Sequence, residues 1–254
     1  ITKWQTIMDE LPPYLINDDG ALKEWSWPGL KDGYAHRHSS HLITVWPLNE
    51  ITAESPSELY KAAQTALNKK DEYNYQDAGH AFVHSALIAA NLNNAKSVNS
   101  KILRLLKTDF YFKSLATAHY SNFKVFCADV ANTMPAIMME MLVNSTSEVI
   151  DLLPAVPESL TKGAVAGIKA LNRVTIENLS WDLDKNTIEC TLKSDIDQQI
   201  TLAQRRGIKS ISTNAKVGPS SIGNTARVIE MKAGQSVKIS LQVNDLPKNL
   251  ALTH

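Results

Sequence analysis

Apolar residues recur with a helical period over the first part of the chain. Residues 59–67 carry one apolar stripe, and the preceding Ser55-Pro56-Ser57-Glu58 has the order of a capping box with proline at the first helical position. Residues 98–106 carry a second stripe, which follows a possible helix N-cap at Asn94. The pattern therefore predicts two amphipathic helices.

Two further segments, residues 78–92 and 135–143, are apolar on almost every side. Helices of this kind are buried on most of their surface, and we expect the second to begin near Pro135. The alternation of amphipathic and almost wholly apolar helices predicts an outer and an inner layer. Both a helical toroid and an ordinary bundle have such layers.

The hydrophobic period changes to two after about residue 146. Apolar and polar residues alternate over residues 188–192 and again over residues 237–243, as in half-buried strands of an antiparallel sheet. Turns are predicted at residues 184–186 and 233–235, and a loop is predicted at residues 218–221.

The two periods divide the sequence into blocks. We predict an α+β fold with a helical part over residues 1–145 and a C-terminal β domain over residues 146–254. A chain of 254 residues has the length of one large domain or two small ones.

Composition excludes several classes of protein. The chain has 26 basic and 26 acidic side chains, so a zero net charge gives it no electrostatic reason to bind nucleic acid. No apolar run approaches the ~20 residues that a membrane-spanning helix needs. Two cysteines form neither a disulfide framework nor a metal cluster.

The densest group of polar side chains lies in residues 34–42, where His36, Arg37, His38 and His41 are close in sequence. A zinc site is the least favoured interpretation, because zinc needs about four ligands and no cysteine or second ligand pair is evident. The histidines could instead bond a loop-to-helix junction. They could also bind a sugar with Arg37, whose guanidinium offers five fixed donors.

His80 and His84 have the spacing of two zinc ligands on one helix face. The residue after His80 is Ala81, so the general-base glutamate of the H-E-x-x-H motif is missing. We therefore reject a metalloprotease and expect histidines of a core or of an inner cavity.

Two carboxylates have apolar neighbours. Asp129 lies between Phe126 and Val130, ahead of the helix expected near Pro135, and is either a structural anion at a helix N-terminus or a catalytic group. Composition alone favours the structural role. Glu24 precedes Trp25, an arrangement found both in sugar-binding platforms and in ordinary cores.

The order of these motifs resembles the C-terminal part of glycoside hydrolase family 95, which contains 1,2-α-L-fucosidases and α-L-galactosidases. The resemblance covers most of residues 10–180. The motifs that carry it are Asp19-Gly20…Glu24-Trp25, His36-Arg37-His38-Ser39-Ser40-His41-Leu42…Trp46-Pro47, Ala128-Asp129…Glu140-Met141-Leu142 and Leu152-Leu153-Pro154-Ala155-Val156-Pro157.

The resemblance implies the C-terminal half of an (α/α)6 toroid followed by a small antiparallel β domain. It also implies an inverting hydrolase with no cofactor or metal, in which Asp129 is the base and Arg37 and His38 bind the sugar. The resemblance further implies a glycan substrate and a periplasmic or secreted bacterial location. We expect four further residues to contribute to sugar binding: His36, Glu24, Trp25 and Asn132.

Three segments depart from the family pattern and indicate a divergent branch. The base motif, Asp-Ala/Gly-Asn-Phe-Gly in the family, is Asp129-Val130-Ala131-Asn132-Thr133 here. Gly-Trp-Ser becomes Gly79-His80-Ala81, and Ala-Arg-Gly-Gly becomes Lys169-Ala170-Leu171-Asn172. These changes leave open a second hypothesis, a non-catalytic carbohydrate-binding or interaction module on the same scaffold.

The family's general acid lies in a Ser-Pro-Glu-Asn-like motif upstream of the segment that resembles residues 19–25, and no residue here matches it. The predicted helices number about half of the twelve that a toroid requires. We therefore expect a C-terminal piece of a larger enzyme, inactive alone, with the missing N-terminal part as its partner.

Overall fold

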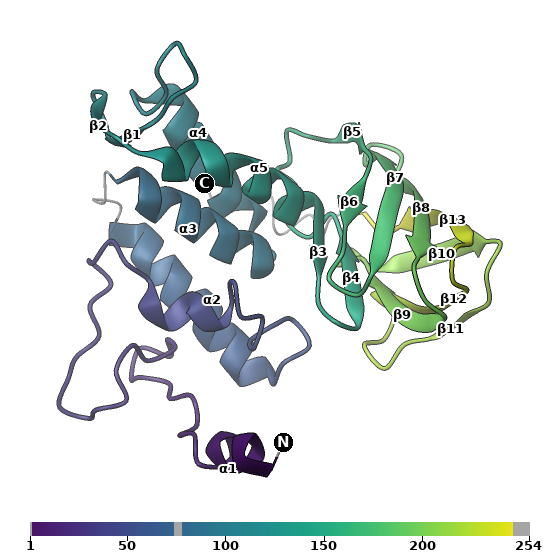
Figure 1. Cartoon of the computed structure of the whole chain (residues 1–254), viewed down its shortest axis with the longest axis horizontal. Coiled ribbons are helices and arrows are strands. Elements are labelled where there is room, and N and C mark those ends of the chain that lie inside the picture. The colour runs from purple at the N-terminus through teal and green to yellow at the C-terminus, as the bar shows by residue number, and fades with distance from the viewer. Residues whose placement is uncertain (1, 74–77, 246–254) are drawn as a thin grey trace.

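Helices occupy one side of the molecule and the strands of the C-terminal region the other in the computed structural model, which describes residues 2–73 and 78–245 (Figure 1). The chain thus has an α+β arrangement with a sheet-rich C-terminal region. The helices are α1 (Thr2–Asp9), the short 3-10 helix η1 (Ser40–Thr44), α2 (Ser57–Tyr73), α3 (Gly79–Asn91), α4 (Ala95–Lys107) and α5 (Ala128–Leu142).

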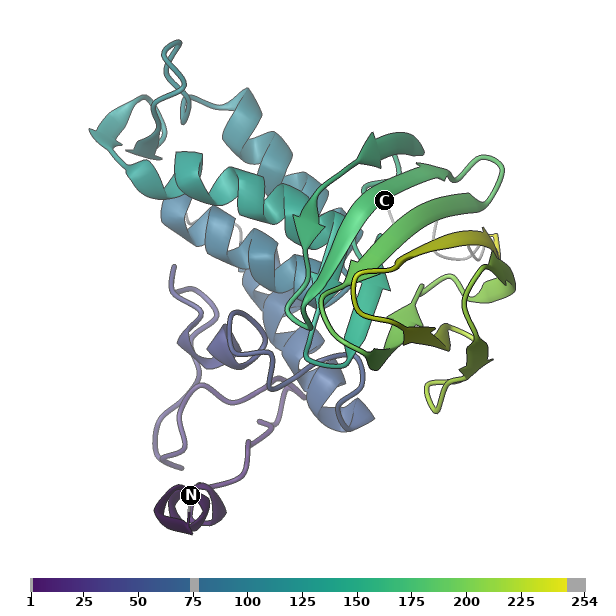
Figure 2. The same cartoon turned by 45° about the vertical axis from the view of Figure 1, so that its right-hand side comes forward.

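Helix α3 is the centre of the helical part. Nine of its residues are buried, which confirms the prediction from its apolar sequence. It packs against both α4 and α5, and these three helices run side by side in Figure 2. The predicted stripe of α2 is also buried, through Ala62, Ala63, Ala66 and Leu67.

The start of α4 is as predicted, whereas the predicted start of α2 is wrong in detail. The Asn94 side chain accepts a hydrogen bond from the amide of Ser97 at 3.0 Å, so it caps α4. The Ser55 hydroxyl, in contrast, accepts from the amide of Thr52 at 2.9 Å and donates to the carbonyl of Glu50. Ser55 therefore stabilises the loop before α2 instead of forming the capping box.

The expected start of α5 near Pro135 is wrong. The helix begins at Ala128, after an extended N-cap residue, Cys127, and Pro135 lies inside it. Proline lacks the amide that would bond one turn back, a cost that packing has to offset. The fully buried Val130 supplies such packing in the first turn. Asp129 consequently lies within this turn, not ahead of the helix.

Two sheets enclose a second core in the C-terminal region. One has the order β10-β13-β8-β7-β5, with β6 also paired to β7, and the other has the order β11-β12-β9-β4-β3. The strands of the first are β5 (Lys162–Val165), β6 (Ile168–Lys169), β7 (Val174–Asp182), β8 (Thr187–Ser194), β10 (Ile208–Thr213) and β13 (Ser236–Val243). Those of the second are β3 (Val143–Ser145), β4 (Val149–Leu152), β9 (Gln198–Ala203), β11 (Val217–Pro219) and β12 (Ala226–Met231).

The alternating pattern of the sequence is confirmed in β8 and β13. Their apolar residues are buried at every second position, and the strands pair antiparallel with Ile239 opposite Cys190. The predicted turn at residues 184–186 joins β7 to β8. Two predictions need correction, because Gly218 and Pro219 belong to β11 and because β4 pairs with β9 in parallel.

A short hairpin of β1 (Ala118–Tyr120) and β2 (Lys124–Phe126) precedes α5. Ala78, the residue before α3, forms an isolated bridge with Tyr120. The hairpin therefore connects the N-terminal ends of α3 and α5. No helix within the described residues has the length and apolar content needed to span a membrane.

Candidate active site

The first turns of α3 and α5 approach each other closely at Gly79. A Cβ atom added to Gly79 would lie 2.5 Å from Cγ2 of Val130 and 3.0 Å from the carbonyl oxygen of Ala118. Contacts this short do not occur for a real side chain, so the approach depends on glycine at this position. It brings the second residue of α3, His80, to the second residue of α5, Asp129.

His80 and Asp129 form an ion-pair contact, with Nδ1 of His80 3.3 Å from Oδ2 of Asp129. The side chains are 41% and 57% exposed, so both remain open to solvent. Asp129 lies in the first turn of α5, where the helix dipole favours a negative charge. Asn132 lies one turn further along α5 and is also exposed, which places it on the same helix face as Asp129.

The loop that carries Arg37 and His38 is held by Lys70 of α2. Its ammonium group donates to the carbonyl oxygens of His36 at 2.8 Å and His38 at 2.9 Å. Burial lowers the pKa of Lys70, and the charge of Glu24 opposes that shift. Two carbonyl acceptors on one partly buried ammonium fix the backbone on both sides of Arg37.

Three histidine rings connect this loop to Asp129. The ring of His38 lies 5.0 Å from that of His36 and 5.7 Å from that of His80, measured between centroids. Arg37 donates from Nε to Nε2 of His38 at 3.2 Å. The structure thus brings Arg37, His38 and Asp129 to one surface, although they are far apart in sequence.

The electrostatic setting keeps part of this cluster neutral near pH 7. Burial, followed by the charges of His36 and Arg37, lowers the pKa of His38. Burial, followed by the charge of His80, likewise lowers the pKa of His84, whose ring packs against Trp46 at a centroid distance of 5.8 Å. A neutral imidazole both donates and accepts hydrogen bonds, which suits sugar hydroxyl groups.

Glu24 and Trp25 lie outside the contacts that join the histidines to Asp129. The amide of Glu24 donates to Asp32 at 2.9 Å, and the carboxylate of Glu24 is close enough to Lys70 to affect its pKa. Trp25 is 46% exposed. Its open indole is compatible with a platform for a sugar, whereas a core position is excluded.

His80 and Lys70 were missed as parts of this site. His80 carried a signal, its spacing from His84, but was assigned to a core or an inner cavity. Lys70 carried none, because its contacts are with backbone carbonyls. Among the residues that the structure describes, no three His, Cys, Asp or Glu side chains are grouped so that they could hold a metal ion.

Comparison with protein-family models identifies the family of this chain. Residues 1–142 match the model of the glycosyl hydrolase family 95 catalytic domain. Residues 144–239 match the model of the glycoside hydrolase family 95 C-terminal domain. The chain belongs to glycoside hydrolase family 95. The resemblance inferred from its motif order is thereby confirmed.

A curated relative of this family 95 chain is "Alpha-L-fucosidase 2" of Arabidopsis thaliana, 30% identical over 193 residues. The match covers 73% of this chain and 22% of the relative, so the chain spans about a fifth of that protein's length. Among solved structures, a GH127 β-L-arabinofuranosidase from Geobacillus stearothermophilus T6 aligns with a TM-score of 0.36 and 11% identity. That alignment covers 65% of this chain and 30% of the other.

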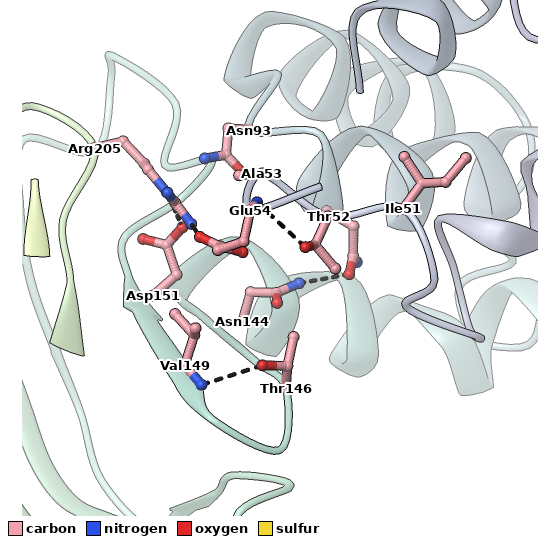
Figure 3. A pocket seen from close by; sticks show the side chains of 11 residues that line it. Ile51, Thr52, Ala53, Glu54, Asn93, Asn144, Thr146, Val149, Asp151 and Arg205 are labelled. Carbon is pink, nitrogen blue, oxygen red and sulfur yellow. Dashed lines mark hydrogen bonds and ion pairs between the residues drawn. The ribbon is translucent and has the colours of Figure 1, made fainter. Parts of the chain in front are cut away.

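A polar pocket, apart from the histidine cluster, lies where the helices of the family 95 chain meet its strands (Figure 3). Arg205, which follows β9, donates to Oε1 of Glu54 at 2.7 Å and also pairs with Asp151 of β4. Asn144 donates to Oδ1 of Asn91 at 2.6 Å. Burial raises the pKa of Asp151 to about 6, although the charge of Arg205 opposes that shift.

Proposed function

We propose that the protein containing these residues is a glycoside hydrolase that cleaves α-L-fucosyl or α-L-galactosyl linkages with inversion. One observation carries the proposal: His38 and Asp129, from motifs 91 positions apart by their numbers, are joined through His80 at one solvent-accessible surface. A site of this kind offers a carboxylate beside the hydroxyl-binding groups of Arg37 and His38. Membership of family 95 supports the same function.

Each residue has a role in the proposed reaction. Asp129 takes a proton from the attacking water, while a carboxylic acid on the opposite side of the sugar protonates the leaving oxygen. Inverting enzymes hold these two groups about 6.5–9.5 Å apart to admit the water. Arg37 and His38 bind the sugar, with His36, Asn132, Glu24 and Trp25 around them.

The general acid would come from another part of the polypeptide. No residue of this chain corresponds to the family's acid motif, so we expect residues 1–254 alone to be inactive. A complete (α/α)6 toroid would supply the acid, with residues 1–145 as its C-terminal half and residues 146–254 as the β domain.

Exposed apolar side chains support the presence of further helices in the complete protein. Helix α1 has no buried residue, and Trp4 is 70% exposed. Trp27 and Phe126 are also 70% exposed, and they lie on the helical part of the chain. We propose that the remaining helices of the toroid cover these side chains.

The test is Asp129→Asn in the full-length protein, assayed with fucosylated and galactosylated oligosaccharides. Losing the base should lower kcat by about 10²- to 10⁴-fold while leaving the unfolding temperature unchanged. Asp195→Asn, at an exposed position in the β region, is the matched control. Undiminished turnover by Asp129→Asn would exclude Asp129 as the base.

A non-catalytic carbohydrate-binding module remains the second candidate. The observation that favours it is the altered sequence after Asp129, where the asparagine stands one position late and no glycine follows. Titration calorimetry of the complete protein with the same oligosaccharides separates the two functions. Binding without any release of monosaccharide would support the module and contradict the hydrolase.

A further inference from the structure

We infer that His80 is a positioning residue for Asp129: it donates a hydrogen bond from Nδ1 to one carboxylate oxygen and leaves the other to face the water. The inference rests on the proposed function of Asp129 as base. It goes further by assigning the group that sets the orientation of that carboxylate, a group on α3 and not in the base motif of α5.

The geometry supports a donor at this position. Nδ1 of His80 lies 3.3 Å from Oδ2 of Asp129, within ion-pair contact distance and just beyond the usual N–H···O range. Both residues occupy the first turn of their helices, and the approach of Gly79 to Val130 fixes the distance between those turns. His80 is therefore held by helix packing, which is the support that a positioning residue needs.

The base motif itself explains why a positioning group is needed. Asn132 is three residues after Asp129, and this spacing on a helix places the two side chains one turn apart. Asn132 is exposed on the same helix face as Asp129, one turn away. The carboxylate of Asp129 contacts His80, from the neighbouring helix, and also the thiol of Cys127, the residue before α5.

His80 also connects the base to the sugar-binding loop. Its ring meets that of His38 edge to face, at a centroid distance of 5.7 Å and an interplanar angle of 61°. On its own helix it lies 6.2 Å from His84. The titratable side chains in contact with His80 are thus Asp129 from α5, His38 from the loop and His84 from α3.

A pair of substitutions tests the inference in the full-length enzyme. His80→Asn keeps an N–H donor near the position of Nδ1 but cannot titrate, whereas His80→Leu has a similar size and no donor. We expect His80→Leu to lower kcat about tenfold with little change in KM, and His80→Asn to restore most of that loss. A purely structural role would lower kcat in both variants alike, so the rescue by His80→Asn is the decisive readout.

A second measurement does not depend on activity. Nitrogen-15 spectra of labelled histidine should show Nδ1 of His80 protonated in the wild-type protein, and that signal should change in Asp129→Asn. A structural role alone would leave that signal unchanged in Asp129→Asn.

The outcomes separate the inference from the proposed function. Full activity of Asp129→Asn would show that Asp129 is not the base, and His80 would then have no base to position. If Asp129→Asn is inactive while His80→Leu has wild-type kinetics, His80 is an ordinary surface contact and the inference is wrong. Equal loss in His80→Leu and His80→Asn would also contradict it, because the retained donor should rescue.

Discussion

Arg205 and Glu54 lie 151 positions apart in the sequence, and their side chains meet at 2.7 Å. Glu54 belongs to the loop before α2, and Arg205 follows β9, so this contact joins the helices to the strands (Figure 3). Arg205 also pairs with Asp151, which is only 3% exposed. One guanidinium therefore bridges two carboxylates at the junction.

Replacing Arg205 with methionine should destabilise the protein by about 3–5 kcal/mol. The change would leave the buried carboxylate of Asp151 without a cation, and breaking a buried pair has a cost of that size. The measurement is denaturant-induced unfolding. Arg206→Met is the matched control, because the hydrogen bond of Arg206 to Gln204 comes from its backbone amide. Equal stability of the two variants would show that the junction does not depend on Arg205.

Asp151 should make stability depend on pH between about pH 4 and pH 6. Its pKa is raised by burial from 3.8 to about 6, so the folded state binds a proton that the unfolded state releases. This contribution is present in full below pH 4 and is lost as the pH rises through 6. The stability of the wild-type protein relative to Asp151→Asn should fall by about 3 kcal/mol from pH 4 to pH 7. A relative stability that rises over this range would contradict the assignment.

The strands were predictable because one face of each is buried. Alternation fixes which residues of β8 point inward, and a shift by one position would expose Ile188, Cys190 and Leu192 together. The start of α4 was predictable because a local cap, Asn94, precedes it. Both signals lie within a few residues of the structure they specify.

The start of α5 and the centre of the site depend on distant residues, so local patterns do not predict them. Proline is common at the first position of a helix, which favoured Pro135 as the start, but burial of Val130 outweighs that preference. The contact of His80 with Asp129 requires Gly79 to fit against Val130. Such a fit between residues 51 positions apart by number is a property of packing, and no local pattern encodes it.

Gly79→Ala should separate the first turns of α3 and α5. The new methyl group would lie 2.5 Å from Val130 and 3.0 Å from a backbone oxygen, and overpacking of this kind costs about 1–3 kcal/mol. We expect a lower unfolding temperature together with reduced turnover, because His80 would move away from Asp129. Gly218→Ala, where nothing lies within 4 Å of the added atom, is the control. If Gly79→Ala were as stable as the wild-type protein, α3 and α5 would accommodate the added methyl group without a loss of folding free energy.

Lys70→Met should weaken substrate binding while leaving Asp129 in place. The ammonium group of Lys70 bonds the carbonyls of His36 and His38, so its loss frees the loop that presents Arg37. We expect KM to rise about tenfold, equivalent to ~1.4 kcal/mol, with a smaller change in kcat, because the acid and base chemistry is untouched. Lys69→Met is the matched control, since Lys69 is the next residue and pairs with Asp19 at 3.5 Å. Steady-state kinetics of the full-length protein decide the matter: if Lys70→Met lowers kcat and leaves KM unchanged, Lys70 acts on the reacting groups and not on the loop.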